Sequence, residues 1–140
     1  MSQKVRVFVQ DDIEKVSDIF EGIPDGWSQN ALKDSLNNES IKSFVLEDDN
    51  NIVAFSAYLV SDDAELCFIV TDKTQQRKGY GEFLLKETLS NINLDCVLEV
   101  RESNFSAINL YEKLGFKLLG KRNNFYQNPR ENALIYKKDI

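Results

Sequence analysis

The segment Gln76-Arg77-Lys78-Gly79-Tyr80-Gly81 is a polar loop with two glycines, between a strand-like run and an amphipathic helix-like run. Glycine lets other groups approach the backbone closely, and the first amides of a helix are unpaired donors at the positive end of its dipole. Such a site binds phosphate. Two glycines before a helix also occur in simple turns, so the loop alone leaves both interpretations open. It is neither a Walker loop, because no Gly-Lys-Ser/Thr ends it, nor a Rossmann fingerprint, because Leu84 stands where a glycine is required.

Glu99 is a charged residue in a run that otherwise resembles a buried strand, Leu98-Glu99-Val100-Arg101. One interpretation is a half-exposed strand whose outer face carries Glu99 and Arg101 at positions i and i+2. The other is a carboxylate that points into a cleft and acts as a general base. Both interpretations fit the local sequence.

Asn104 and Tyr111, seven residues apart, are a second pair of polar candidates. On a helix they can be a cap and a packing aromatic. In a cleft they can be an amide anchor and a phenolic acid.

The composition excludes several kinds of chemistry. The sequence has no histidine, which rules out Ser-His-Asp and Cys-His catalysis and metal sites that need imidazole. Cys67 and Cys96 both lie in apolar strand-like runs, where a free thiol behaves as a small buried hydrophobe, so we expect neither a disulfide nor a metal site. The net charge of −6 argues against nucleic-acid binding and is compatible with a cationic partner. Without a run long and apolar enough for a membrane span, we expect a cytoplasmic protein.

Alternating strand-like and helix-like runs must position these candidates. We expect strands over 5–9, 41–47, 52–60, 65–71, 96–100, 116–119 and 133–136. Four helices are expected: after a cap at Asp11 or Asp12, after a cap at Ser28, after the glycine loop, and over 106–114 before Gly115. This order predicts an α/β fold, a mixed sheet with helices on its faces, in a single domain of residues 1–140.

Together these segments resemble the GNAT superfamily of N-acetyltransferases over almost the whole chain. The glycine loop is similar to the superfamily's Gln/Arg-x-x-Gly-x-Gly/Ala signature, and 98–116 is similar to the segment that follows it. The match is closest to the bacterial ribosomal-protein alanine N-acetyltransferases, on the strength of Trp27-Ser28, Arg122-Asn123, Phe125-Tyr126 and Arg130-Glu131-Asn132-Ala133. The resemblance implies a twisted, mostly antiparallel sheet of six to seven strands, about four flanking helices, and splayed central strands.

The resemblance also implies a cosubstrate, acetyl-coenzyme A, and roles for individual residues. Glu99 would be the general base and Tyr111 the general acid of a direct transfer without an acyl-enzyme. A strand amide near Val70 would meet the oxyanion. Backbone groups at the end of one strand, Ile69, Val70 and Thr71, would hold the acetyl and pantetheine portion. The side-chain amide of Asn104 would bind the pantetheine arm. The pyrophosphate would be held by the backbone amides of the loop, those of Arg77, Lys78, Gly79, Tyr80, Gly81 and Glu82.

The implied acceptor is the N-terminal α-amine of a basic ribosomal protein that begins with alanine, and the enzyme is expected to be a monomer or weak dimer. Trp27, Phe125 and Tyr126 are the substrate-side candidates. Asn124 departs from the family pattern as an insertion before the aromatic pair, and Asn132 stands where aspartate is usual. Two alternatives stay open: an acetyltransferase for a small amine or polyamine, and a non-catalytic module that binds acetyl-coenzyme A.

Overall fold

The computed structural model describes residues 3–140. Its strands are β1 (Gln3–Val7), β2 (Ile41–Asp48), β3 (Asn51–Val60), β4 (Ala64–Thr71), β5 (Cys96–Arg101), β6 (Lys117–Tyr126) and β7 (Glu131–Lys138). Its α-helices are α1 (Ile13–Phe20), α2 (Gln29–Ser35), α3 (Tyr80–Ile92) and α4 (Phe105–Lys113), with short 3-10 turns over Gln10–Asp12 and Lys73–Gln75. The seven strands form one sheet in the order β1-β2-β3-β4-β5-β7-β6. Every neighbouring pair is antiparallel except β4 and β5, which confirms the expected mixed, mostly antiparallel α/β fold.

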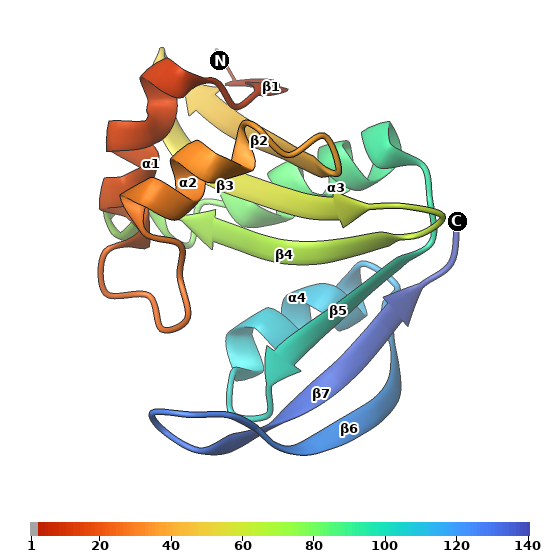
Figure 1. The fold of residues 1–140 in the computed structure, drawn as a ribbon. Helices are drawn as coiled ribbons and strands as arrows, with labels where there is room; N and C mark the ends of the chain where they lie inside the picture. The colour runs from red at the N-terminus through yellow and green to blue at the C-terminus, as the bar shows by residue number, and fades with distance from the viewer. Residues whose placement is uncertain (1–2) are drawn as a thin grey trace.

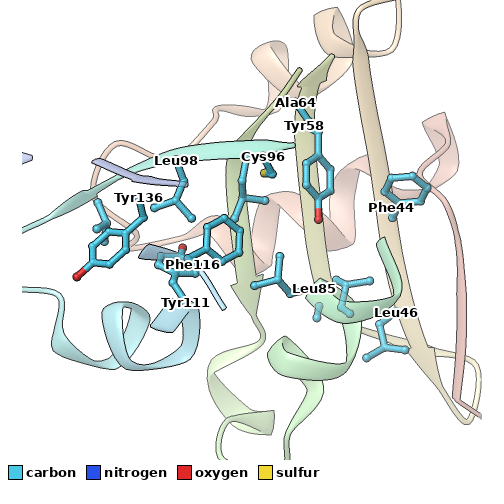
Figure 2. Close-up of a cluster of buried hydrophobic side chains, with 14 of the residues drawn as sticks. Phe44, Leu46, Tyr58, Ala64, Leu85, Cys96, Leu98, Tyr111, Phe116 and Tyr136 are labelled. Atoms are coloured by element: carbon cyan, nitrogen blue, oxygen red, sulfur yellow. The ribbon is translucent and has the colours of Figure 1, made fainter. Parts of the chain in front are cut away.

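Helices cover both faces of the sheet (Figure 1). On one face, α1 and α2 pack over β2, β3 and β4 around Phe8, Val16, Leu32 and Phe55. On the other face, α3 and α4 bury a second cluster that extends across β5 and β7 (Figure 2). Because β5 alternates buried and half-buried residues, Cys96, Leu98 and Val100 point to the second cluster, and Glu99 and Arg101 point to the opposite face.

The central strands diverge. β4 and β5 pair only at Ala64 with Cys96 and at Glu65 with Val97, near their first residues. Their last residues separate, and Figure 1 shows the resulting V-shaped opening between the two arrowheads. A β-bulge explains the bend: the register of β3 against β4 shifts so that Cys67 has no partner, and a bulge increases the local twist. The expected splay is confirmed.

Most expected elements are present, and three local signals are confirmed in detail. Ser28 caps α2, since its Oγ accepts a hydrogen bond from the Ala31 amide at 3.1 Å. Asp49 and Asn50 adopt the left-handed conformation (φ 50° and 69°) that the β2–β3 hairpin turn requires. Gly115, after α4, has φ 98°.

Other boundaries were wrong. The expected strands 116–119 and 133–136 are the much longer β6 and β7, and the first strand ends at Val7. β6 is an edge strand with mainly exposed, polar residues, so it lacks the apolar alternation that marks a strand in a sequence. It is also irregular: Asn124, the apparent insertion, has φ 55° and lies within a register shift. The Asn124 amide donates to Oδ1 of Asn132 at 2.9 Å, so this asparagine supports the irregular segment.

Asp12 precedes α1 but does not cap it with its side chain, contrary to expectation. Its carboxylate instead accepts hydrogen bonds from the Val9 amide at 2.9 Å and from both terminal nitrogens of Arg6 at 2.8 Å. The hydrogen bonds from Arg6 hold the pKa of Asp12 below its ordinary value. The carboxylate therefore joins β1 to the start of α1.

Candidate active site

A cleft of about 480 Å³ occupies the opening between β4 and β5. Its walls come from four segments that are distant in the sequence: the α1–α2 loop, β4, the β5–α4 segment and the end of β6. The lining residues include Pro24, Asp25, Glu65, Cys67, Ile69, Val70, Glu99, Arg101, Asn104, Tyr111, Phe125 and Tyr126. The cleft thus brings together Glu99, Asn104 and Tyr111, which the sequence singled out separately.

Glu99 and Tyr111 reach this cleft from opposite faces of the sheet. Glu99 points away from the cluster under α3 and α4, whereas Tyr111 belongs to that cluster. In a continuous sheet, backbone would lie between them. The splay of β4 and β5 removes that barrier, so one bound molecule can contact both side chains.

The Glu99 carboxylate is available to accept a proton. Its side chain is 24% exposed, and the Arg122 Nε lies 2.9 Å from its Oε2. No donor in residues 3–140 meets the geometry of a hydrogen bond to the buried Oε2, so the contact with Arg122 is an ion pair. Arg122 therefore contributes positive charge beside the carboxylate without occupying the lone pairs of this oxygen.

Tyr111 is a buried phenol whose hydroxyl has no partner among residues 3–140. Its ring packs against Phe116 with centroids 5.7 Å apart, below β5 (Figure 2). Burial raises the pKa of Tyr111 above its ordinary value. The hydroxyl is consequently protonated at neutral pH and can donate.

Asn104 serves as a helix cap and still has a free donor. Its Oδ1 accepts a hydrogen bond from the Ala107 amide at 3.2 Å at the start of α4. The cap fixes the side-chain amide, and its Nδ2 group has no acceptor within the described part of the chain. Asn104 can therefore cap the helix with its oxygen and still donate from its nitrogen to a bound molecule.

The loop before α3 has the geometry of an anion site. Arg77 and Gly79 have positive φ values of 67° and 81°, and the backbone between left-handed residues of this kind is concave. Within residues 3–140, the amides of 77–82 donate to no protein acceptor, as expected at a helix start. The Tyr80 side chain is turned into the core, where its hydroxyl donates to the Asp48 carboxylate. Only the backbone of Tyr80 is thus presented at the loop.

The edge of β4 that faces the opening carries further free amides. The Asp72 amide donates to the Val53 carbonyl at 2.8 Å on the β3 side. Because antiparallel ladders alternate, the Val70 amide also points to β3, and the amides of Ile69 and Thr71 point to the open side. The amides of Ile69 and Thr71, and not the amide of Val70, can therefore donate to a molecule bound in the opening.

The three residues predicted to contact the acceptor substrate lie in different places. Phe125 and Tyr126 line the cleft. Burial, with the nearby carboxylates of Glu99 and Asp25, raises the pKa of Tyr126 to about 12, so its hydroxyl stays neutral. Trp27 does not line the cleft; it packs edge-on against Phe68, with ring centroids 5.0 Å apart, in the cluster under α1 and α2.

Sequence reasoning missed three charged lining residues, Asp25, Glu65 and Arg101. Arg101 appeared only as a partner of Glu99 on an exposed strand face. Since Glu99 and Arg101 share one face of β5, a cleft at Glu99 also implied a role for Arg101 beside it. Asp25 lies in a loop, where no periodicity could identify it.

Residues 12–116 match the sequence profile of the Acetyltransferase (GNAT) family. The chain belongs to this family. It is thus an acetyl-coenzyme A-dependent N-acetyltransferase, in agreement with the superfamily resemblance.

Individual GNAT relatives share most of the chain. A [Ribosomal protein bS18]-alanine N-acetyltransferase of Haemophilus influenzae is 38% identical over 117 residues, 78% of this chain and 79% of the relative. One of Haemophilus ducreyi is 31% identical over 144 residues, which covers 94% of this chain and 96% of the relative. The crystal structure of the ribosomal-protein-S18-alanine N-acetyltransferase from Escherichia coli superposes with a TM-score of 0.90 at 29% identity, covering 99% and 94% of the two chains.

The GNAT cosubstrate fits the free groups of the site. The pyrophosphate of acetyl-coenzyme A is a dianion that needs several amide donors, and the amides of 77–82 are free. The pantetheine arm carries amides, which suit the strand edge at Ile69 and Thr71 and the Nδ2 group of Asn104. Among residues 3–140, no group of three or more acidic or cysteine side chains could hold a metal ion, and no helix has the length and hydropathy to cross a membrane.

Gly81→Val should weaken coenzyme A binding about tenfold or more while the protein stays folded. A Cβ at Gly81 would lie 3.2 Å from Thr71 Oγ1, and we expect the branched valine side chain to obstruct the close approach of an anion to the loop amides. Isothermal titration with coenzyme A measures the effect. Gly120→Ala is the control, since a Cβ there has no neighbour within 4 Å. Unchanged affinity in a folded Gly81→Val protein would contradict a pyrophosphate site at this loop.

Proposed function

We propose that this enzyme transfers acetyl from acetyl-coenzyme A to the N-terminal α-amine of a ribosomal protein that begins with alanine. The observation that carries the proposal is the cleft itself, in which Glu99 and Tyr111 meet one opening from opposite faces of the sheet. The two Haemophilus relatives are N-acetyltransferases of the alanine of ribosomal protein bS18, and this supplies the acceptor class. We infer that residues 3–140 work as one catalytic domain, in the cytoplasm where ribosomal proteins are made.

In the proposed mechanism, each side chain moves one proton. Acetyl-coenzyme A supplies an activated thioester carbonyl. An α-ammonium group has a pKa near 7.7 to 8.0, so much of the acceptor is protonated at neutral pH and must lose a proton before its nitrogen attacks. Glu99 accepts that proton, directly or through water. Amides of the open β4 edge, at Ile69 or Thr71, donate to the oxyanion as the carbon–nitrogen bond forms. Tyr111 donates its proton to the sulfur as the carbon–sulfur bond breaks. The nitrogen loses its second proton in the same step, and that proton returns through water to the Tyr111 phenolate.

The charge of the cleft suits a cationic acceptor. Its lining contains three carboxylates, Asp25, Glu65 and Glu99, and a single guanidinium, Arg101. Arg101 is already paired with Asp25 and with Glu131, and Arg122 lies beside Glu99, so four carboxylates face two guanidinium groups. Negative charge that is not neutralised locally attracts an ammonium group and the basic side chains that follow it in a ribosomal protein.

Release of coenzyme A on a peptide that begins with alanine tests the proposal. We expect turnover of a basic peptide with a free N-terminal alanine. The control is the same peptide with an acetylated N-terminus, which keeps its internal lysines and should not be turned over. Spermidine and an aminoglycoside test the small-amine alternative. Preferential turnover of either small amine would overturn the peptide assignment. Binding of acetyl-coenzyme A without turnover of any amine would favour a non-catalytic module.

A further inference from the structure

Arg101, at the end of β5, uses its complete set of hydrogen-bond donors. A guanidinium carries five N–H groups. Its Nε donates to Asp25 Oδ2 at 3.1 Å, and its two terminal nitrogens donate to Asp25 Oδ1 at 3.4 Å, Gln127 O at 3.1 Å, Pro129 O at 2.9 Å and Glu131 Oε1 at 3.2 Å. The side chain is only 13% exposed. Five donors therefore meet five acceptors in a fixed arrangement.

Apart from Glu131, at the start of β7, these acceptors belong to two segments that are distant in the sequence. Asp25 comes from the loop between α1 and α2, and Gln127 and Pro129 come from the turn between β6 and β7. The guanidinium carbon also lies 4.4 Å from the ring centroid of Tyr126, a distance at which a cation is attracted to an aromatic face. Arg101 thus links the α1–α2 loop and the β6–β7 turn to β5, the strand that carries Glu99. We call these two segments the acceptor side of the cleft.

The linkage fixes relative positions as well as contacts. Arg101 and Glu99 are two residues apart on the same face of β5, so segments attached to Arg101 are held at a set distance from the base. Asp25 lies in a loop at φ 64°, and the β6–β7 turn follows the irregular end of β6. Neither segment has a strand partner across the opening to define its place.

We propose that Arg101 is a positioning residue that assembles the acceptor side of the cleft and thereby sets the affinity for the acceptor amine. The inference rests on the proposed function for the identity of the acceptor. Lysine cannot replace this arginine, because an ammonium has three donors on one atom and cannot span acceptors arranged around a planar fork.

Arg101→Gln should raise the KM for an alanine-initiated peptide by about 10-fold to 10²-fold, since misplaced binding groups cost this much even without contact to the reacting atoms. The kcat at saturating peptide should change by less than about threefold, and the affinity for coenzyme A should stay the same. Arg101→Lys should recover little of the loss. In the Arg101→Gln background, Asp25→Asn should add almost nothing to the hydrogen exchange of 22–26, because the Arg101–Asp25 contact is already lost.

Arg6→Gln is the matched control. Arg6 also joins two carboxylates, Asp12 at 2.8 Å and Glu47 at 2.6 Å, but on β1, away from the cleft. Both variants should lose thermal stability, and only Arg101→Gln should raise the peptide KM. Equal KM values for the two variants, measured per folded molecule, would overturn the proposal.

Amide hydrogen exchange separates this inference from the proposed function. Arg101→Gln should increase exchange in both 22–26 and 127–130, and Arg6→Gln should not. Protection that is unchanged in these two segments would overturn the positioning role even if the peptide is a substrate. If the wild-type enzyme acetylates only a small amine, the proposed function fails, and the KM for that amine together with the exchange data still decides the role of Arg101.

Discussion

Tyr111→Phe should lower kcat by about 10²-fold or more and leave the affinity for acetyl-coenzyme A nearly unchanged. The hydroxyl is needed only when the sulfur leaves with its electron pair, and general acid catalysis contributes about 10² to 10⁴ in rate. Burial raises the pKa of Tyr111, so the wild-type phenol holds its proton across the neutral range in which the reaction is assayed. Phenylalanine keeps the ring that packs against Phe116. Steady-state kinetics and equilibrium binding measure the two effects separately.

Tyr136→Phe is the control for this experiment. Tyr136 lies in the same buried cluster, and its hydroxyl donates to Glu112 Oε2 at 2.8 Å instead of lining the cleft (Figure 2). Its loss should lower the free energy of unfolding by about 1 kcal/mol without changing turnover. If Tyr111→Phe behaves like this control, Tyr111 is a packing residue and another group protonates the thiolate.

Glu99→Gln should lower kcat/KM at pH 7 by roughly 10² or more and hardly change cofactor affinity. Glutamine keeps the size and shape of the side chain but cannot accept a proton. As the pH rises above about 8, solvent removes the proton from the acceptor amine, and the missing base matters less. The difference between variant and wild type should therefore narrow toward about pH 9 to 10, which a pH–rate profile on an alanine-initiated peptide measures.

Glu47→Gln is the matched control, because Glu47 is another strand carboxylate paired with an arginine, Arg6, outside the cleft. It should change stability and leave the shape of the pH–rate profile alone. Superimposable profiles for wild type and Glu99→Gln would show that Glu99 is a surface carboxylate of the sheet with no part in the chemistry.

Features with a local cause were predictable from the sequence. The cap at Ser28, the β2–β3 turn and the αL residue Gly115 each depend on a few neighbouring residues, and all three are confirmed. The glycine loop and the strand with Glu99 were identified because an anion site and a charged strand residue leave a local pattern. The superfamily resemblance then supplied the splay, which no local pattern indicates.

Features that depend on distant contacts were not predictable. The partners of Arg101 lie 76 and 26 to 30 residues away in the sequence, so nothing around Arg101 distinguishes it from an exposed strand residue. Trp27 is an aromatic residue beside a loop, and only the packed structure shows it in the cluster under α1 and α2. Most of β6 was not predicted as a strand. Its residues contact one neighbouring strand and solvent, so they need not alternate between apolar and polar.

The short pairing of β4 with β5 also has a thermodynamic consequence. Two residue pairs are the whole ladder between the first four strands and the last three, so the sheet is weakest along this line. A molecule bound in the opening contacts both parts and stabilises the folded state by mass action, by about 2.7 kcal/mol when its free concentration is 100 times its Kd. That amount is a large fraction of the stability of an ordinary domain. Acetyl-coenzyme A at the proposed site would be such a molecule, so the fraction of folded enzyme should rise with its free concentration.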